Sequence, residues 1–138
     1  MNIDKIVSIS GKPGLYQVIS QNKNAVIVES LLDKKRIPVN SLQSISALSD
    51  IAIYTYDEEI PLREVFLNIH KKENGEMTID PKSDKKQLQS YFNEVLPNYD
   101  EERVYPSNIK KIVLWYNTLV EAGFDFSSLE EKKEEEKE

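Results

Sequence analysis

The sequence contains no cysteine, a single histidine and no long apolar run, and each shortage excludes a class of function. Without cysteine, the chain can form neither a disulfide nor a cysteine-based zinc site. Because no stretch approaches about 18 consecutive apolar residues, the sequence predicts no membrane-spanning helix. The N-terminus carries an acid at Asp4 and no long apolar segment, so it lacks the pattern of a secretory signal. Together these absences predict a cytoplasmic protein.

The 138 residues carry a net charge of −6, which is unevenly distributed along the chain. Residues 1–56 contain six Lys or Arg and four Asp or Glu, a net charge of +2. Residues 57–138 contain twelve and twenty, a net charge of −8. Such an asymmetry can indicate separate partners for the two halves, but it is also ordinary for two small domains, and we favour the second explanation.

Short apolar runs separated by turn-forming clusters organise the first part of the chain. The runs cover residues 15–19, 25–28 and 37–39, and Gly, Pro, Asn, Asp and Lys fill the breaks between them. In residues 51–56 the spacing of a strand places Ile51 and Ile53 on one face and Tyr54 and Tyr56 on the other, so this run can close the sheet. Pro38 cannot donate to a sheet ladder, so it predicts an edge strand or a bulge. The pattern predicts an SH3-like or Sm-like small antiparallel β-barrel over about residues 1–58.

A change of apolar spacing at Asp57 marks the start of the helical part of the chain. From Leu62 onward the apolar residues follow at a helical spacing, which predicts a helix at about residues 60–72. Pro61 is expected to be its first residue, because the fixed φ of proline suits that position. The polar residues 73–83 then predict a linker.

Two further helices are predicted to pack as a hairpin within residues 84–129. Asp84 and Gln87 have the spacing of a capping box at the start of the first of these helices. Ser107 or Asn108 is expected to cap the next helix. The aromatic residues that follow its C-terminal end are expected to fold back over the hairpin.

The chain is therefore expected to have an α+β fold in four parts. These are a small β-barrel with a following helix at 1–72, a linker at 73–83, a helical hairpin domain at 84–129 and a charged disordered tail at 130–138. The tail is assigned by composition, since it contains only Glu and Lys. The core is expected to include Ile27, Ile53, Phe66, Phe92 and Ile112.

Three stretches of the sequence resemble an uncharacterised bacterial family. They are SISGKPGLYQVISQNKNAVIVESLLDKKRIPV, DIAIYTYDEEIPLREVF and YFNEVLPNYDEERVYPSNIKKIVLWYN. The family is found in Bacteroidetes and carries the label "domain of unknown function", and the resemblance covers about residues 3–122. It implies a small β domain followed by a helical domain, and it implies no catalytic or binding residue.

The sequence shows no arrangement typical of an enzyme, a metal site or a cofactor site. His70 has neither a cysteine nor a second histidine as a partner, and it is expected in the last turn of a helix. Residues 11–14 have the GxxG form of a KH-domain loop, but they join two predicted strands, so a tight turn is favoured. The acidic triplets at 57–59 and 100–102 lack the pattern of a calcium loop and are expected to be solvated. We therefore expect no catalytic residue, metal ligand or cofactor.

Basic and aromatic side chains of the predicted barrel form a candidate patch for RNA or single-stranded nucleic acid. Small barrels hold single strands by neutralising phosphates and by stacking bases on aromatic rings. The net charge of +2 in this half is well below that of a typical nucleic-acid binder, so this function is the alternative. The candidate residues are Lys12, Lys23, Lys34, Lys35, Arg36, Tyr54 and Tyr56.

Aromatic side chains of the predicted hairpin form a candidate surface for a protein partner. The candidate residues are Tyr91, Trp115 and Tyr116. Tyr and Trp are frequent anchors at interfaces, but they also fill small cores, and the sequence leaves both roles open. The preferred function is a non-enzymatic module that binds another protein.

Overall fold

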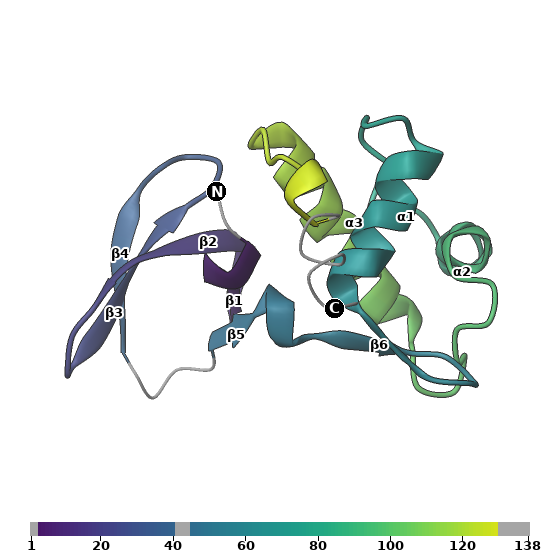
Figure 1. The fold of residues 1–138 in the computed structure, drawn as a ribbon, viewed down its shortest axis with the longest axis horizontal. Coiled ribbons are helices and arrows are strands. Elements are labelled where there is room, and N and C mark those ends of the chain that lie inside the picture. Colours follow the sequence, from purple (N-terminus) through teal and green to yellow (C-terminus); the bar gives the residue numbers. More distant parts are fainter. Residues whose placement is uncertain (1–2, 41–44, 130–138) are drawn as a thin grey trace.

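The structure, a computed structural model, describes residues 3–40 and 45–129 and has an α+β architecture (Figure 1). The strands are β1 (Ile6–Ile9), β2 (Lys12–Gln21), β3 (Ala25–Ser30), β4 (Arg36–Asn40), β5 (Ile45–Ala47), β6 (Ala52–Tyr54) and β7 (Glu59–Pro61). The helices are α1 (Leu62–Lys72), α2 (Lys85–Val95) and α3 (Pro106–Glu121), with 3₁₀ turns η1 (Ile3–Lys5) and η2 (Leu48–Asp50). None of the helices in these two ranges is long and apolar enough to cross a membrane. The expected tail, residues 130–138, lies outside the described residues.

The first five strands form one antiparallel sheet in the order β4-β3-β2-β1-β5. Among the described residues this sheet is open, with β4 and β5 at its edges (Figure 1). Pro38 lies in the edge strand β4, as expected for a residue that has no N–H to donate.

The prediction that residues 51–56 close this sheet is wrong, because β6 pairs with β7 instead. The Thr55 hydroxyl accepts hydrogen bonds from the N–H groups of Asp57 and Glu58 and so stabilises a tight turn between the two strands. On the other side of β6, the Tyr54 carbonyl accepts from the Asp100 N–H at 2.9 Å. The backbone of β6 thus forms its hydrogen bonds with β7 and with Asp100, and not with the five-stranded sheet.

The two faces of the sheet belong to two separate hydrophobic cores, as the alternation of side chains in a strand requires. One face contributes Ile6, Leu15 and Leu31 to the main core, which it shares with the helices. The other face forms a second core whose fully buried members are Val7, Ile9, Val28 and Val39. The sheet and the helices therefore share the main core, while the second core belongs to the sheet alone.

Four of the five residues expected in the core are buried. They are Ile53, Phe66, Phe92 and Ile112, all of which lie in the main core. The expectation for Ile27 is wrong, because that side chain is only half-buried. Its neighbour Val28 points to the opposite face of β3 and is the buried residue.

The helices begin close to the residues that local capping signals indicate. The capping box of α2 is confirmed: Asp84 Oδ1 accepts from the Gln87 N–H at 2.9 Å, and Gln87 Oε1 accepts from the Asp84 N–H at 3.2 Å. Pro61 precedes α1 as its N-cap instead of being its first residue.

The start of α3 lies slightly earlier than expected. Ser107 or Asn108 was expected as the cap, but the N-cap is Tyr105 and Pro106 is the first helical residue. The correction follows from the proline, whose fixed φ suits that position. Asn108 still stabilises the helix start, because its Oδ1 accepts from the Tyr105 N–H at 2.8 Å.

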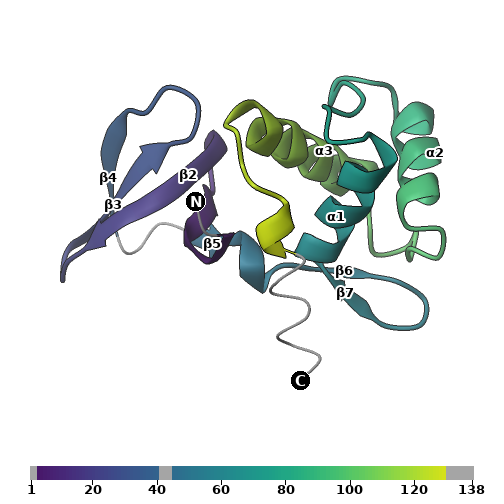
Figure 2. The same ribbon diagram turned by 45° about the horizontal axis from the view of Figure 1, so that its top comes forward.

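The chain after α3 folds back, as expected. Gly123 has a φ of +78°, which suits glycine and lets the chain reverse there. Phe124, Phe126 and Leu129 are buried in the main core, and the Phe126 ring stacks on His70 at 4.6 Å between ring centroids. Figure 2 shows this returning segment beside α1.

Residues 73–83, expected as a linker, contain no helix or strand and are held against α3 by hydrogen bonds. The Thr78 N–H donates to Asn117 Oδ1 at 2.8 Å. The Tyr116 hydroxyl donates to the Glu76 carbonyl, also at 2.8 Å. The segment therefore packs as part of the helical half, and the division of the chain into domains stays a prediction.

Candidate functional site

The structure does not bring the candidate nucleic-acid residues together. Lys34 and Lys35 lie in the turn between β3 and β4, and Arg36 begins β4. Lys23 lies in the turn between β2 and β3, at the other end of the strands. Lys12 begins β2, next to the turn after β1. The basic candidates therefore lie at both ends of the sheet, with Lys23 apart from the others.

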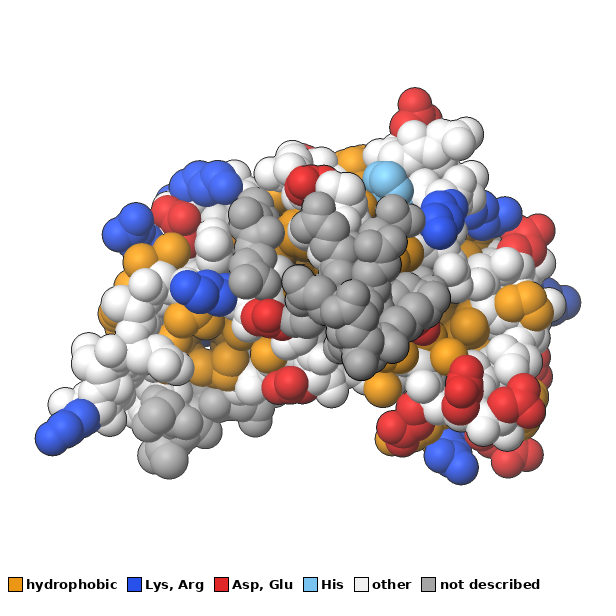
Figure 3. All heavy atoms as spheres, viewed as in Figure 1, with side chains coloured by type: hydrophobic (Ala, Val, Ile, Leu, Met, Phe, Trp, Pro, Cys, Tyr) orange, Lys and Arg blue, Asp and Glu red, His pale blue; other side chains and the backbone are white. Residues whose placement is uncertain are grey.

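The two tyrosines of that set lie on the β6–β7 hairpin and face an acidic region. The Tyr54 ring lies 4.9 Å from the Arg103 guanidinium, and the Tyr56 hydroxyl accepts from the Glu101 N–H at 3.4 Å. These contacts bring the acidic triplets 57–59 and 100–102 side by side. Figure 3 shows the resulting acidic group at the lower right. No group of three or more His, Cys, Asp or Glu within residues 3–40 and 45–129 is arranged to hold a metal ion.

Two of the three residues expected on a partner surface are buried. Tyr91 is 8% exposed, and its hydroxyl donates to Glu73 Oε2 at 2.8 Å. Tyr116 is fully buried. Burial raises the pKa of the Tyr91 hydroxyl, and the nearby Glu73 carboxylate raises it further. Burial also raises the pKa of Tyr116, to about 12. The expectation that both could serve as surface anchors is wrong, because they lie on the inward faces of α2 and α3.

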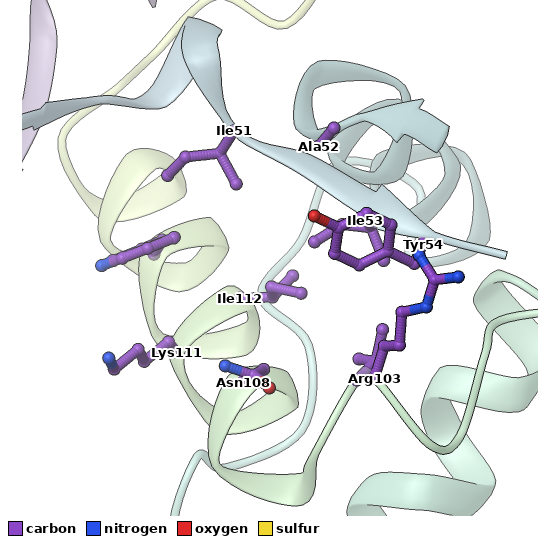
Figure 4. A pocket seen from close by; sticks show the side chains of 10 residues that line it. Ile51, Ala52, Ile53, Tyr54, Arg103, Asn108, Lys111 and Ile112 are labelled. Carbon is purple, nitrogen blue, oxygen red and sulfur yellow. The ribbon is translucent and has the colours of Figure 1, made fainter. Parts of the chain in front are cut away.

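Trp115 is half-buried on α3 and lies between two hollows of the surface. The first, of about 220 Å³, lies between β6 and α3 (Figure 4). Its lining is mainly apolar, with Ile51 and Ile53 on the strand side and Ile112 on the helix side. Arg103 and Tyr54 close one end of this apolar hollow.

The second hollow, of about 430 Å³, lies between the β1–β2 turn and α3. Its lining combines polar and apolar groups: Ser8, Ile9, Ser10, Gly11, Lys12, Gly14 and Ser46 from the sheet side, with Lys111, Leu114 and Trp115 from α3. Gly11 and Gly14 have φ values of +82° and +87°, which explains two glycines in the turn. A Cβ on either glycine would meet no atom within 4 Å, so this side of the hollow is open.

The two hollows share Trp115 and Lys111, and we name the surface that they form the Trp115 groove. Its cations are Lys12, Arg103 and Lys111, and no Asp or Glu lines either hollow. Arg103 is paired with Asp100, at 3.3 Å between Nε and Oδ2. Lys12 and Lys111 form no ion pair with another described residue. The groove is therefore positively charged on an otherwise acidic protein.

The groove joins one residue from each predicted set with residues that the sequence did not single out. Lys12 was expected in the nucleic-acid patch and Trp115 on the partner surface. Lys111 and Arg103 were missed, because no motif marks a lysine or arginine that becomes functional only when α3 packs against β1 and β6. The helical spacing of Lys111 and Trp115, four residues apart, was the available signal.

Comparison with known proteins matches the chain to two family models. One, described as "Domain of unknown function (DUF6852)", matches residues 51–119, and the other, "Domain of unknown function (DUF5606)", matches residues 3–48. A solution NMR structure of a Bacteroides vulgatus protein from a structural genomics consortium is 48% identical, with a TM-score of 0.75 and 88% of each chain covered. No curated protein matches. The resemblance to an uncharacterised Bacteroidetes family is confirmed.

Proposed function

The chain belongs to the family defined by the domains of unknown function DUF5606 and DUF6852, whose descriptions name no function. From the geometry of its surface, we propose that the protein is a non-enzymatic cytoplasmic module that binds another protein through the Trp115 groove. The observation that carries this proposal is the half-buried Trp115 beside an apolar hollow. Trp is one of the residues enriched among the anchors that dominate binding energy at protein interfaces, and such anchors lie in well-packed pockets.

Binding of RNA or single-stranded nucleic acid is the alternative, and Lys12, Lys111 and Trp115 in one groove favour it. Cations that neutralise phosphates beside an aromatic ring are the usual means of holding a single strand. Three cations are few, however, and the acidic triplets lie next to the Arg103 end of the groove. A phosphate backbone that extended in this direction would be repelled.

The expected SH3-like or Sm-like barrel also belongs to this proposal. The second core supports it, since Val7, Ile9, Val28 and Val39 are buried on a face of the sheet that packs against side chains of its own strands. A sheet buries such a face on itself only when it is strongly curled. The partner would then bind at the junction between this barrel and α3.

The test is capture of partners from native lysate by the immobilised full-length protein, with and without nuclease. A protein partner is expected to remain bound after nuclease treatment, because its contacts do not depend on nucleic acid. Mass spectrometry of the two samples gives the measurement. Partners that disappear with nuclease would contradict the proposal and support the alternative.

A further inference from the structure

Building on the proposed function, we propose that the Trp115 groove binds an acidic peptide segment that carries one large apolar side chain. The apolar side chain enters the hollow between β6 and α3. The carboxylates lie in the second hollow, which Lys12 and Lys111 line. Two halves of one peptide are thus recognised by two different chemistries on either side of Trp115.

The apolar hollow has the size and lining for a single side chain. Its volume of about 220 Å³ is below the range of about 300–1,000 Å³ typical of small-molecule sites. Ile51, Ile53 and Ile112 point into it from two elements, so an apolar side chain would be surrounded by aliphatic groups (Figure 4). Burial of apolar surface there would supply the main attraction.

The second hollow has the charge to bind carboxylates. Lys12 comes from the sheet and Lys111 from α3, so the two ammonium groups belong to opposite walls. Both side chains are exposed, and neither forms an ion pair with an acidic side chain within residues 3–40 and 45–129, so a carboxylate of a partner can reach them. Ser8, Ser10 and Ser46 add hydroxyl groups that can donate to the same oxygens.

The distribution of charge favours a peptide over a nucleic acid. In Figure 4, Lys111 extends from α3 away from Tyr54 and Arg103, which lie at the acidic end of the groove. A peptide needs carboxylates only at the end of the groove that Lys12 and Lys111 line. Its apolar side chain can lie in the hollow beside Tyr54 and Arg103, where no negative charge is required. A nucleic acid carries a phosphate on every nucleotide and would meet the acidic hairpin.

The experiment is selection of a phage-displayed random peptide library on the full-length protein. Selected sequences are expected to contain Asp or Glu beside one large apolar residue. The fluorescence of Trp115, the single tryptophan, then reports binding of a synthetic selected peptide. In the Lys12→Glu/Lys111→Glu variant, affinity for this peptide should fall at least about tenfold, because two attractions become repulsions. The affinity of the unchanged protein for this peptide should also fall with added salt, because salt screens the attraction between exposed charges.

The matched control is Lys34→Glu/Lys35→Glu, which reverses two exposed charges in the β3–β4 turn and should leave affinity within about twofold. Selection of neutral or basic peptides, or equal losses in both variants, would overturn the inference. A library that yields no binder would overturn it as well. Tighter binding of a single-stranded RNA pool at Trp115 would instead support the alternative function. If lysate partners survive nuclease while acidic peptides fail, the proposed function stands and only this inference falls.

Discussion

Replacement of Phe92 by alanine is expected to lower the free energy of unfolding by about 3–5 kcal/mol. Phe92 is fully buried on α2 and packs edge-to-face against Tyr99, with ring centroids 4.9 Å apart. Removing the ring leaves a cavity in the main core in addition to the lost transfer free energy. Urea unfolding followed by circular dichroism measures the change.

A matched control for this variant is Leu32→Ala, at a side chain that is 49% exposed in the β3–β4 turn. Because little apolar surface is lost there, its effect should stay within about 0.5 kcal/mol. A Phe92→Ala loss as small as that of Leu32→Ala would mean that the inward face of α2 is wrongly assigned.

Leu15→Ala is expected to destabilise the helices as well as the sheet, by about 2–5 kcal/mol. Leu15 is almost fully buried on β2 and belongs to the same core as α1, α2 and α3. Because Trp115 lies on α3, its fluorescence reports unfolding of the helical half. The transition seen by Trp115 should therefore move to lower urea concentration when a residue of the sheet is truncated.

Ile19→Ala provides the comparison, because Ile19 lies on the same strand and is 38% exposed. Its effect should be about 1 kcal/mol or less. If Leu15→Ala left the Trp115 transition unchanged, the sheet and the helices would unfold independently. That result would favour separate domains over one shared core.

The helices were the most predictable part of the fold, since their signals are local. Asp84 and Gln87 are three residues apart, and their capping box could be recognised without knowing any tertiary contact. The position of β6 could not be recognised in this way. Its alternating pattern fits any sheet, and its pairing with β7 depends on the turn at Thr55 and on contacts with Tyr99 and Asp100.

The candidate site was only partly predictable for the same reason. Composition drew attention to Lys12 and to Trp115, but their shared groove exists because α3 packs beside the β1–β2 turn. Tyr91 and Tyr116 have the same amphipathic character as interface anchors, and here their hydroxyl groups bond inside the protein. Sequence alone does not distinguish a tyrosine that bonds to Glu73 from one that faces a partner.

The most direct test of the Trp115 groove is the dissociation constant of the purified, captured partner, measured by calorimetry. Trp115→Ala should weaken binding by about 2 kcal/mol or more, which is about 30-fold, while circular dichroism shows an unchanged fold. Leu32→Ala, which removes an exposed apolar side chain outside the groove, should change the constant by no more than about twofold. An unchanged constant for Trp115→Ala, or an equal loss for Leu32→Ala, would contradict the assignment of this groove as the protein-binding surface.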